Sequence, residues 1–149
     1  NVTGKKPKNL LKLLNNSKVQ KIFHFARFDV AVLKHTYKIH IKNIYCTKIA
    51  SKLARTYTDK HGYKDLCREL LNETISKVEQ SSDWGGKLSK DQKEYAASDV
   101  LYLHQLKGIL DQELIKLDRK DIADQCFSFI KTRVDLDLKG WPDIDIFSH

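Results

Sequence analysis

Methionine and long apolar runs are both absent from this chain of 149 residues, which begins at Asn1. Because translation starts with methionine, we expect a processed chain, a fragment or a trimmed product. No apolar run approaches the roughly 18 residues that a membrane-spanning helix needs. No apolar segment follows the first lysines, as one would in a signal peptide. The sequence therefore predicts no contact with a membrane.

Cysteine is scarce, with three residues at Cys46, Cys67 and Cys126. Their odd number, their wide spacing and the lack of a CxxC pair argue against a disulfide framework and against a zinc site. Cys46 and Cys67 fall in apolar patterns, which is typical of buried free thiols. Reduced thiols fit a protein of the cytoplasm.

Acidic residues are missing from the first 28 positions, and the whole chain has 27 Lys and Arg against 19 Asp and Glu, a net charge of +8. A basic balance favours a polyanionic partner, above all nucleic acid. The lysines are scattered over predicted solvent faces, so charge alone defines no binding surface. The length indicates one domain over 1–149 that can bury a substantial core.

Short strands alternate with amphipathic helices, a pattern typical of an α/β domain. Strands are predicted at 20–26 and 43–46, although two strands alone rarely make a stable sheet. In the longest helix, Ser89 and Gln92 match a capping box, and Gly108 is the expected weak point. Helices are predicted at about 7–16, 28–37, 47–57, 63–71, 89–117 and 118–130, followed by a tail at 131–149.

Three residues have side chains suited to hydrolytic chemistry. Tyr95 and Asp99 are four positions apart in a helical pattern, so they lie on one face, about one turn apart. Such a pair can hold a water molecule and aim it at phosphorus beside a divalent metal ion. Asp29 follows a strand, at the kind of edge where α/β sheets bind ligands. The structural alternatives are a half-buried tyrosine, a solvent-facing Asp99 and a helix cap at Asp29.

Two motifs stand in a definite order: Phe-His-Phe-Ala-Arg-Phe-Asp at 23–29 and Tyr-Ala-Ala-Ser-Asp at 95–99. They resemble the second and third exonuclease motifs of the DEDD superfamily, the third in its tyrosine-bearing form. The intervening segments 62–67, 82–84 and 88–89 resemble ribonuclease D-type 3′-5′ exonuclease domains. The resemblance extends from about residue 8 to 110, which is most of the chain.

The resemblance implies a ribonuclease H-like fold, in which helices flank a mixed sheet whose first strands are missing from this chain. It also implies two-metal hydrolysis of phosphodiester bonds from the 3′ end of RNA or single-stranded DNA. Asp29 and Asp99 would be ligands of two Mg²⁺ or Mn²⁺ ions, and Tyr95 would orient the attacking water.

The chain departs from the family at its first motif, Asp-x-Glu, because residues 1–28 contain no acid. The one Asp-x-Glu present, at 111–113, falls late in a predicted helix and is interpreted as a solvated face. These absences together predict that the amino-terminal part is lacking and that this chain alone has little activity. The alternatives are a catalytically incompetent nucleic-acid-binding or assembly module of the same fold, and an unrelated α/β domain. An uncovered sheet edge could pair with another chain, so oligomeric state stays open.

Weaker candidates come from other positions. Lys48, Lys52 and Arg55 follow the second strand at helical spacing and could contact phosphates, although a solvated helix face is the simpler interpretation. Trp84 is either a base-stacking platform or a loop anchor on the core. His24 is interpreted as a core histidine. A polar tail, rather than a metal site, is predicted for Asp135, Asp137, Asp143, Asp145 and His149.

Overall fold

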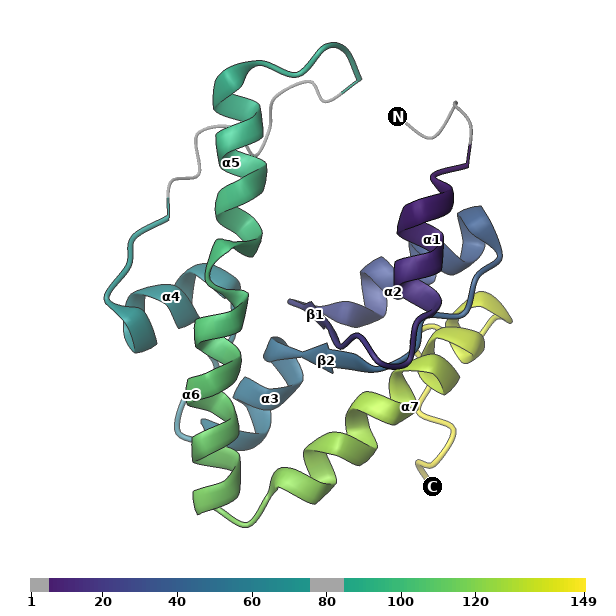
Figure 1. Cartoon of the computed structure of the whole chain (residues 1–149). Coiled ribbons are helices and arrows are strands. Elements are labelled where there is room, and N and C mark those ends of the chain that lie inside the picture. The colour runs from purple at the N-terminus through teal and green to yellow at the C-terminus, as the bar shows by residue number, and fades with distance from the viewer. Residues whose placement is uncertain (1–5, 76–84) are drawn as a thin grey trace.

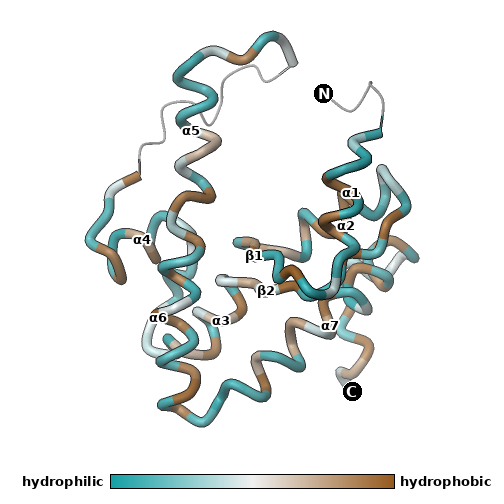
Figure 2. Tube along the Cα trace, in the orientation of Figure 1, coloured by the Kyte–Doolittle hydropathy of each residue, from teal (hydrophilic) through white to brown (hydrophobic). Residues whose placement is uncertain are grey.

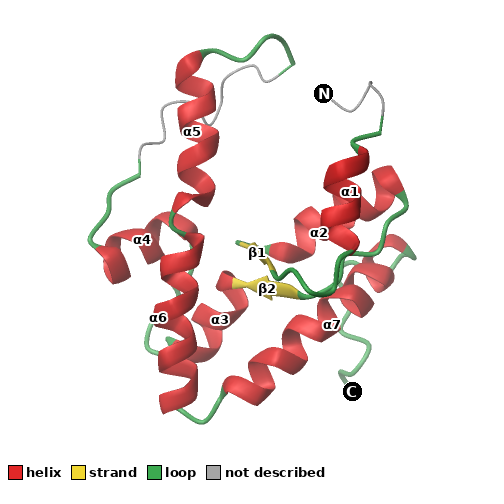
Figure 3. Cartoon of the chain, in the orientation of Figure 1, coloured by secondary structure: helices red, strands yellow, loops and turns green. Residues whose placement is uncertain are grey.

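The computed structural model describes residues 6–75 and 85–149, and within them helices surround a small parallel sheet (Figures 1 and 3). This mixed arrangement confirms the predicted α/β class. The elements in chain order are α1 (Lys8–Asn15), β1 (Lys21–Phe23), α2 (Ala26–Tyr37), β2 (Ile44–Cys46), α3 (Thr47–Ala54), α4 (Tyr63–Leu71), α5 (Lys90–Leu101), α6 (Leu103–Lys116) and α7 (Lys120–Leu138).

The two strands pair in parallel, with Ile22 opposite Tyr45, and α2 forms the crossover between them. β1 is shorter than the strand predicted at 20–26. The backbone enters the left-handed region at Phe25, with φ 64°, and α2 begins at the next residue. Strand geometry cannot continue through such a turn, so the helix starts earlier than its apolar pattern suggested.

The core lies between the sheet and helices α2, α3, α6 and α7. α7 packs on α2 and β2, where the rings of Tyr45 and Phe127 lie 4.5 Å apart between centroids. Figure 2 shows apolar residues gathered along β2 and recurring at intervals along α6 and α7. The Cys46 and Cys67 thiols are buried and free, as predicted. Within the described residues, no helix is long and apolar enough to cross a membrane.

The helix predicted at 89–117 is two helices. Its amino-terminal capping box is present, because the Ser89 hydroxyl and the Gln92 backbone N–H meet at 3.0 Å and the reciprocal bond is 2.9 Å long. The break falls at Tyr102, not at Gly108. α6 buries four leucines against the body, whereas Gln92 is the one buried residue of α5. α5 therefore rises away from the body (Figure 1).

The carboxy-terminal helix is longer than predicted, so the prediction of a tail beginning at residue 131 is wrong for 131–138. Ile130 and Val134 are buried and continue the apolar stripe of α7. Asp135 and Asp137 form ion pairs with Lys34 and Arg27 of α2. Ion pairs to a neighbouring helix explain this acidic alternation, which the sequence alone did not explain.

Candidate active site

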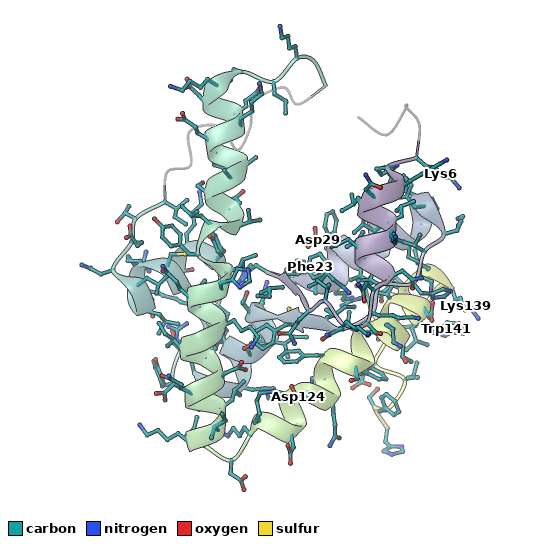
Figure 4. The ribbon with its side chains drawn as sticks, viewed as in Figure 1. Lys6, Phe23, Asp29, Asp124, Lys139 and Trp141 are labelled. Atoms are coloured by element: carbon teal, nitrogen blue, oxygen red, sulfur yellow. The ribbon has the colours of Figure 1, made fainter. Side chains whose placement is uncertain are left out.

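A cleft of about 1020 Å³ lies at the carboxyl end of β1, and Asp29, Tyr95 and Asp99 all line it. One wall comes from β1 and α2, and the other comes from α4, α5 and the start of α6. Figure 4 shows Phe23 and Asp29 on the side of the body that faces α5. The structure therefore places in one cleft the three side chains that the sequence singled out.

Asp29 projects from the first turn of α2, where a carboxylate is stabilised by the positive end of the helix dipole. The capping position belongs to Phe25, and no side chain caps this helix, so Asp29 is not a helix cap. The side chain is half-buried, and burial raises the pKa of its carboxyl above the ordinary value of 3.8. Partial burial of a charge in a cleft is typical of functional sites.

Tyr95 and Asp99 lie one turn apart on α5, and Tyr63 of α4 holds that helix in place. The Tyr63 hydroxyl donates to the Ser98 carbonyl at 2.8 Å and accepts from the Tyr102 N–H at 3.3 Å. Burial raises the pKa of Asp99, and the Lys64 ammonium partly opposes this shift. Burial and the Asp99 charge raise the pKa of Tyr95, so its hydroxyl stays protonated at neutral pH.

Lys64 and His24 also line this cleft, although sequence reasoning gave neither a role in the site. The Lys64 ammonium lies 5.5 Å from the centre of the Tyr95 ring. Lys64 stands in the family-like segment 62–67, which was the available signal. His24 is half-buried, not enclosed in the core, so its interpretation as a core histidine is wrong.

The acidic residues present fit a hard divalent cation. Three carboxylates line the cleft, those of Asp29, Asp65 and Asp99, and Asp65 forms an ion pair with Arg68. Mg²⁺ is often held by one or two carboxylates with waters and substrate phosphates. In the part of the chain that the structure describes, no cluster of three or more His, Cys, Asp or Glu could hold a metal ion. Because Asp65 is engaged by Arg68 at 2.7 Å, Asp29 and Asp99 are the stronger candidates for protein ligands.

Arg55 is not available to phosphate in this fold. Its side chain is 3% exposed and forms an ion pair with Glu69, while its guanidinium donates to the Lys60 carbonyl at 2.9 Å. This burial also contradicts the solvated-face interpretation. Lys48 lies with its ammonium 4.2 Å from the centre of the Phe25 ring, outside the residues that line the cleft. Trp84 lies outside the described residues.

The other acidic candidates lie outside the cleft. Asp111 is not on a solvated face, because its carboxylate is 17% exposed and pairs with Lys107 one turn earlier on α6. It does not line the cleft. Asp143 and Asp145 lie in the exposed segment after α7, as the tail interpretation predicted.

The 3′-5′ exonuclease family model matches residues 3–115, and the chain belongs to this family. Ribonuclease D of Nitrobacter hamburgensis is 34% identical over 110 residues, which cover 73% of this chain and 28% of that protein. Ribonuclease D of Xanthomonas oryzae pv. oryzae is 29% identical over 135 residues, covering 89% of this chain and 37% of that protein. The chain thus spans roughly a third of the length of these relatives, or less.

Solved structures give a longer match. Brucella melitensis NrnC bound to pGG is 55% identical with a TM-score of 0.93, covering 99% of this chain and 72% of that one. The same protein with bound Mg²⁺ is 55% identical with a TM-score of 0.91, over 97% and 71%. Escherichia coli RNase D, at 23% identity and a TM-score of 0.78 over 87% and 35%, shows the shared fold. These matches confirm the predicted ribonuclease H-like fold.

Proposed function

We propose that this protein is a 3′-5′ exoribonuclease of ribonuclease D type, which hydrolyses phosphodiester bonds from the 3′ end of RNA. One observation carries the proposal: Asp29, Tyr95 and Asp99, separated by up to 70 residues in sequence, line one cleft in a chain of the 3′-5′ exonuclease family. Single-stranded DNA is the second substrate class to test.

Asp29 and Asp99 would hold divalent cations, Mg²⁺ or Mn²⁺, and we propose two ions. The Brucella melitensis structure with bound Mg²⁺ supports the first of these metals. When bound, such ions neutralise charge on the phosphate and make water a better nucleophile. The raised pKa values of both carboxyls agree with a site that binds cations in competition with protons.

Tyr95 would position the attacking water. Its raised pKa keeps the hydroxyl protonated, so it can donate one hydrogen bond and accept another. The adjacent Lys64 ammonium would attract the phosphate into the cleft. Lys48 remains a proposed contact for nucleic acid farther along the bound strand.

Short RNA is the proposed substrate class. The Brucella melitensis relative is bound to pGG, a dinucleotide with a 5′ phosphate, and its structure aligns with almost all of this chain. A dinucleotide places one scissile phosphate beside two sugars, which is within the capacity of a cleft of about 1020 Å³. We also propose a cytoplasmic location, because the thiols of Cys46 and Cys67 are free.

One observation favours a second candidate, a nucleic-acid-binding or assembly module without catalysis. Of the three carboxylates that line the cleft, Asp65 is paired with Arg68, which leaves Asp29 and Asp99, and the described residues contain no group of three or more metal-ligating side chains. If no further carboxylate joins them in the full-length protein, metal affinity falls and binding can persist without cleavage.

The test compares full-length protein with three variants on pGG and on 3′-labelled single-stranded RNA, with Mg²⁺ or Mn²⁺. Asp29→Asn and Asp99→Asn should lower kcat/KM by about a hundred-fold or more, and Tyr95→Phe by a smaller factor of about ten to a hundred. The matched control is Asp91→Asn, an exposed acid on the same helix as Asp99, which should keep wild-type activity.

Cleavage by wild type that is lost in the Asp29 and Asp99 variants supports the exonuclease. RNA binding with a steep salt dependence and no cleavage by wild type would instead support the binding module. Equal activity in Asp99→Asn and Asp91→Asn would refute the assigned site.

A further inference from the structure

His24 directly follows β1 and lines the same cleft, and two neighbouring side chains fix its orientation. Its Nδ1 lies 2.9 Å from the Thr47 hydroxyl, and its ring lies 5.8 Å from the ring of Tyr63 between centroids. Thr47 is fully buried at the start of α3, so its hydroxyl cannot turn to solvent.

The partners of Thr47 determine which nitrogen of His24 carries the proton. The Thr47 hydroxyl lies 3.2 Å from the Phe23 carbonyl, to which it donates. A hydroxyl has one proton, so it can only accept from His24. Nδ1 of His24 is therefore the N–H donor, and Nε2 is an unprotonated acceptor. Nε2 has no hydrogen-bond partner among the described residues. It is also absent from their fully buried side-chain atoms without a partner, so it is accessible to solvent.

The surroundings keep this imidazole neutral. Burial, assisted by the Lys48 ammonium, lowers the pKa of His24 from 6.5 to about 4. A neutral ring with a free Nε2 can accept a hydrogen bond from a ligand but cannot donate one there. Phosphate oxygens are acceptors too, so phosphate is not the partner. The donors that a nucleotide offers are its sugar hydroxyls and the N–H groups of its bases.

We propose that Nε2 of His24 accepts a hydrogen bond from the ribose 2′-hydroxyl of the bound nucleotide and so favours RNA over DNA. The 3′ oxygen at the scissile phosphate is esterified and has no proton, so the 2′-hydroxyl is the sugar donor beside that phosphate. The free 3′-hydroxyl of the terminal nucleotide is shared by RNA and DNA, and an acceptor bound to it would leave the ribo-to-deoxy ratio unchanged in His24→Asn. Base N–H groups lie farther from the phosphorus and differ between bases. This inference rests on the proposed function, because it assumes that Asp29 and Asp99 mark the position of the phosphate.

Two substitutions distinguish the contributions of the two ring nitrogens of His24. His24→Asn places an amide near Nδ1, so the bond to Thr47 can persist while the acceptor in the cleft is lost. His24→Gln places an amide near Nε2 and can restore an acceptor there. The full-length protein is assayed with Mg²⁺ on pGG and on the same dinucleotide lacking its 2′-hydroxyls, and the ribo-to-deoxy ratio of kcat/KM is measured.

We expect wild type to prefer the ribonucleotide by roughly ten-fold, the typical effect of one good hydrogen bond. His24→Asn should reduce the ratio to near one, and His24→Gln should recover part of it. A wild-type ratio of one, or an unchanged ratio in His24→Asn, overturns the proposal. An equal loss on both substrates with an unchanged ratio would indicate a purely structural role.

A second measurement does not require catalysis. Nitrogen NMR of wild type without divalent ions should show His24 protonated on Nδ1 and bare on Nε2, and pGG should shift the Nε2 resonance more than its deoxy analogue does. A proton on Nε2, or equal shifts with both ligands, overturns the inference. If this shift is seen but no RNA is cleaved, the proposed function fails while the role of His24 stands.

Discussion

The ion pair between Arg27 and Asp137 joins the first turn of α2, which carries Asp29, to the last turn of α7. It is bidentate, with Nε to Oδ2 at 2.7 Å and Nη2 to Oδ1 at 2.8 Å, and Arg133 adds a bond of 3.0 Å to Oδ1. We predict that Asp137→Asn destabilises the protein, because it removes the charge that both guanidiniums share.

The magnitude follows from the exposure of the pair. Exposed ion pairs contribute up to about 1 kcal/mol, and breaking a buried pair costs about 3–5 kcal/mol. Asp137 is 13% exposed and Arg27 is 39% exposed, so the pair lies between these limits. We expect a loss of about 2 kcal/mol in the free energy of unfolding, which lowers Tm by roughly 4–8 °C.

The assay is urea unfolding followed by circular dichroism, with unchanged dependence on urea concentration. The matched control is Asp135→Asn, which breaks the neighbouring pair with Lys34 between the same two helices. Asp135 is 47% exposed, so this change should have an effect below about 1 kcal/mol. An Asp137→Asn variant that is no less stable than Asp135→Asn would refute the reasoning.

The pH dependence gives a second check on the same pair. Burial alone raises the pKa of Asp137, but hydrogen bonds from Arg27 and Arg133 outweigh it and lower the pKa below 3.8. The stabilisation is therefore complete above the unfolded-state pKa, near 3.9, and is lost as pH falls through the lower folded-state pKa. The difference between wild type and Asp137→Asn should be full at neutral pH and should shrink only in strong acid.

Three further predictions concern polar contacts of buried or half-buried side chains. Arg55→Ala should lower the free energy of unfolding by about 3 kcal/mol in urea titrations, because it leaves Glu69 without its buried partner. Tyr63→Phe should cost about 1 kcal/mol and lower kcat/KM on pGG several-fold, because it removes the bond that holds Ser98 and thus α5. The free energy of unfolding of wild type should fall by up to about 3 kcal/mol as pH is lowered from 6.5 to about 4, because the unfolded chain protonates His24 at a higher pH than the folded chain does. Urea titrations of His24→Asn should lack this fall.

Local sequence patterns predicted the helices, strands and caps that interactions between neighbouring residues determine. The helix at Tyr63–Leu71, the strand at Ile44–Cys46 and the capping box at Ser89 follow from apolar spacing and from the hydrogen-bonding groups at hand. The motif residues Asp29, Tyr95 and Asp99 could be named because their chemistry and spacing are distinctive.

Features set by tertiary contacts could not be predicted in this way. The break at Tyr102 depends on a hydroxyl that comes from 39 residues earlier in the chain. The extension of α7 depends on ion pairs of Asp135 and Asp137 with α2, over a hundred residues away. His24 looked like a core residue because a strand pattern does not show which neighbours cover it. Its acceptor nitrogen is apparent only once Thr47 is in place.

The break at Tyr102 also determines which wall of the cleft can open locally. α5 carries Tyr95 and Asp99 but buries only Gln92, so it can open while α6 stays folded. Amide hydrogens of α5 should then exchange with solvent through a local opening of low free energy, and those of α6 only through global unfolding. Two of the three proposed catalytic residues therefore belong to a segment with little core of its own, and a nucleotide bound between α2 and α5 would supply the packing that α5 lacks.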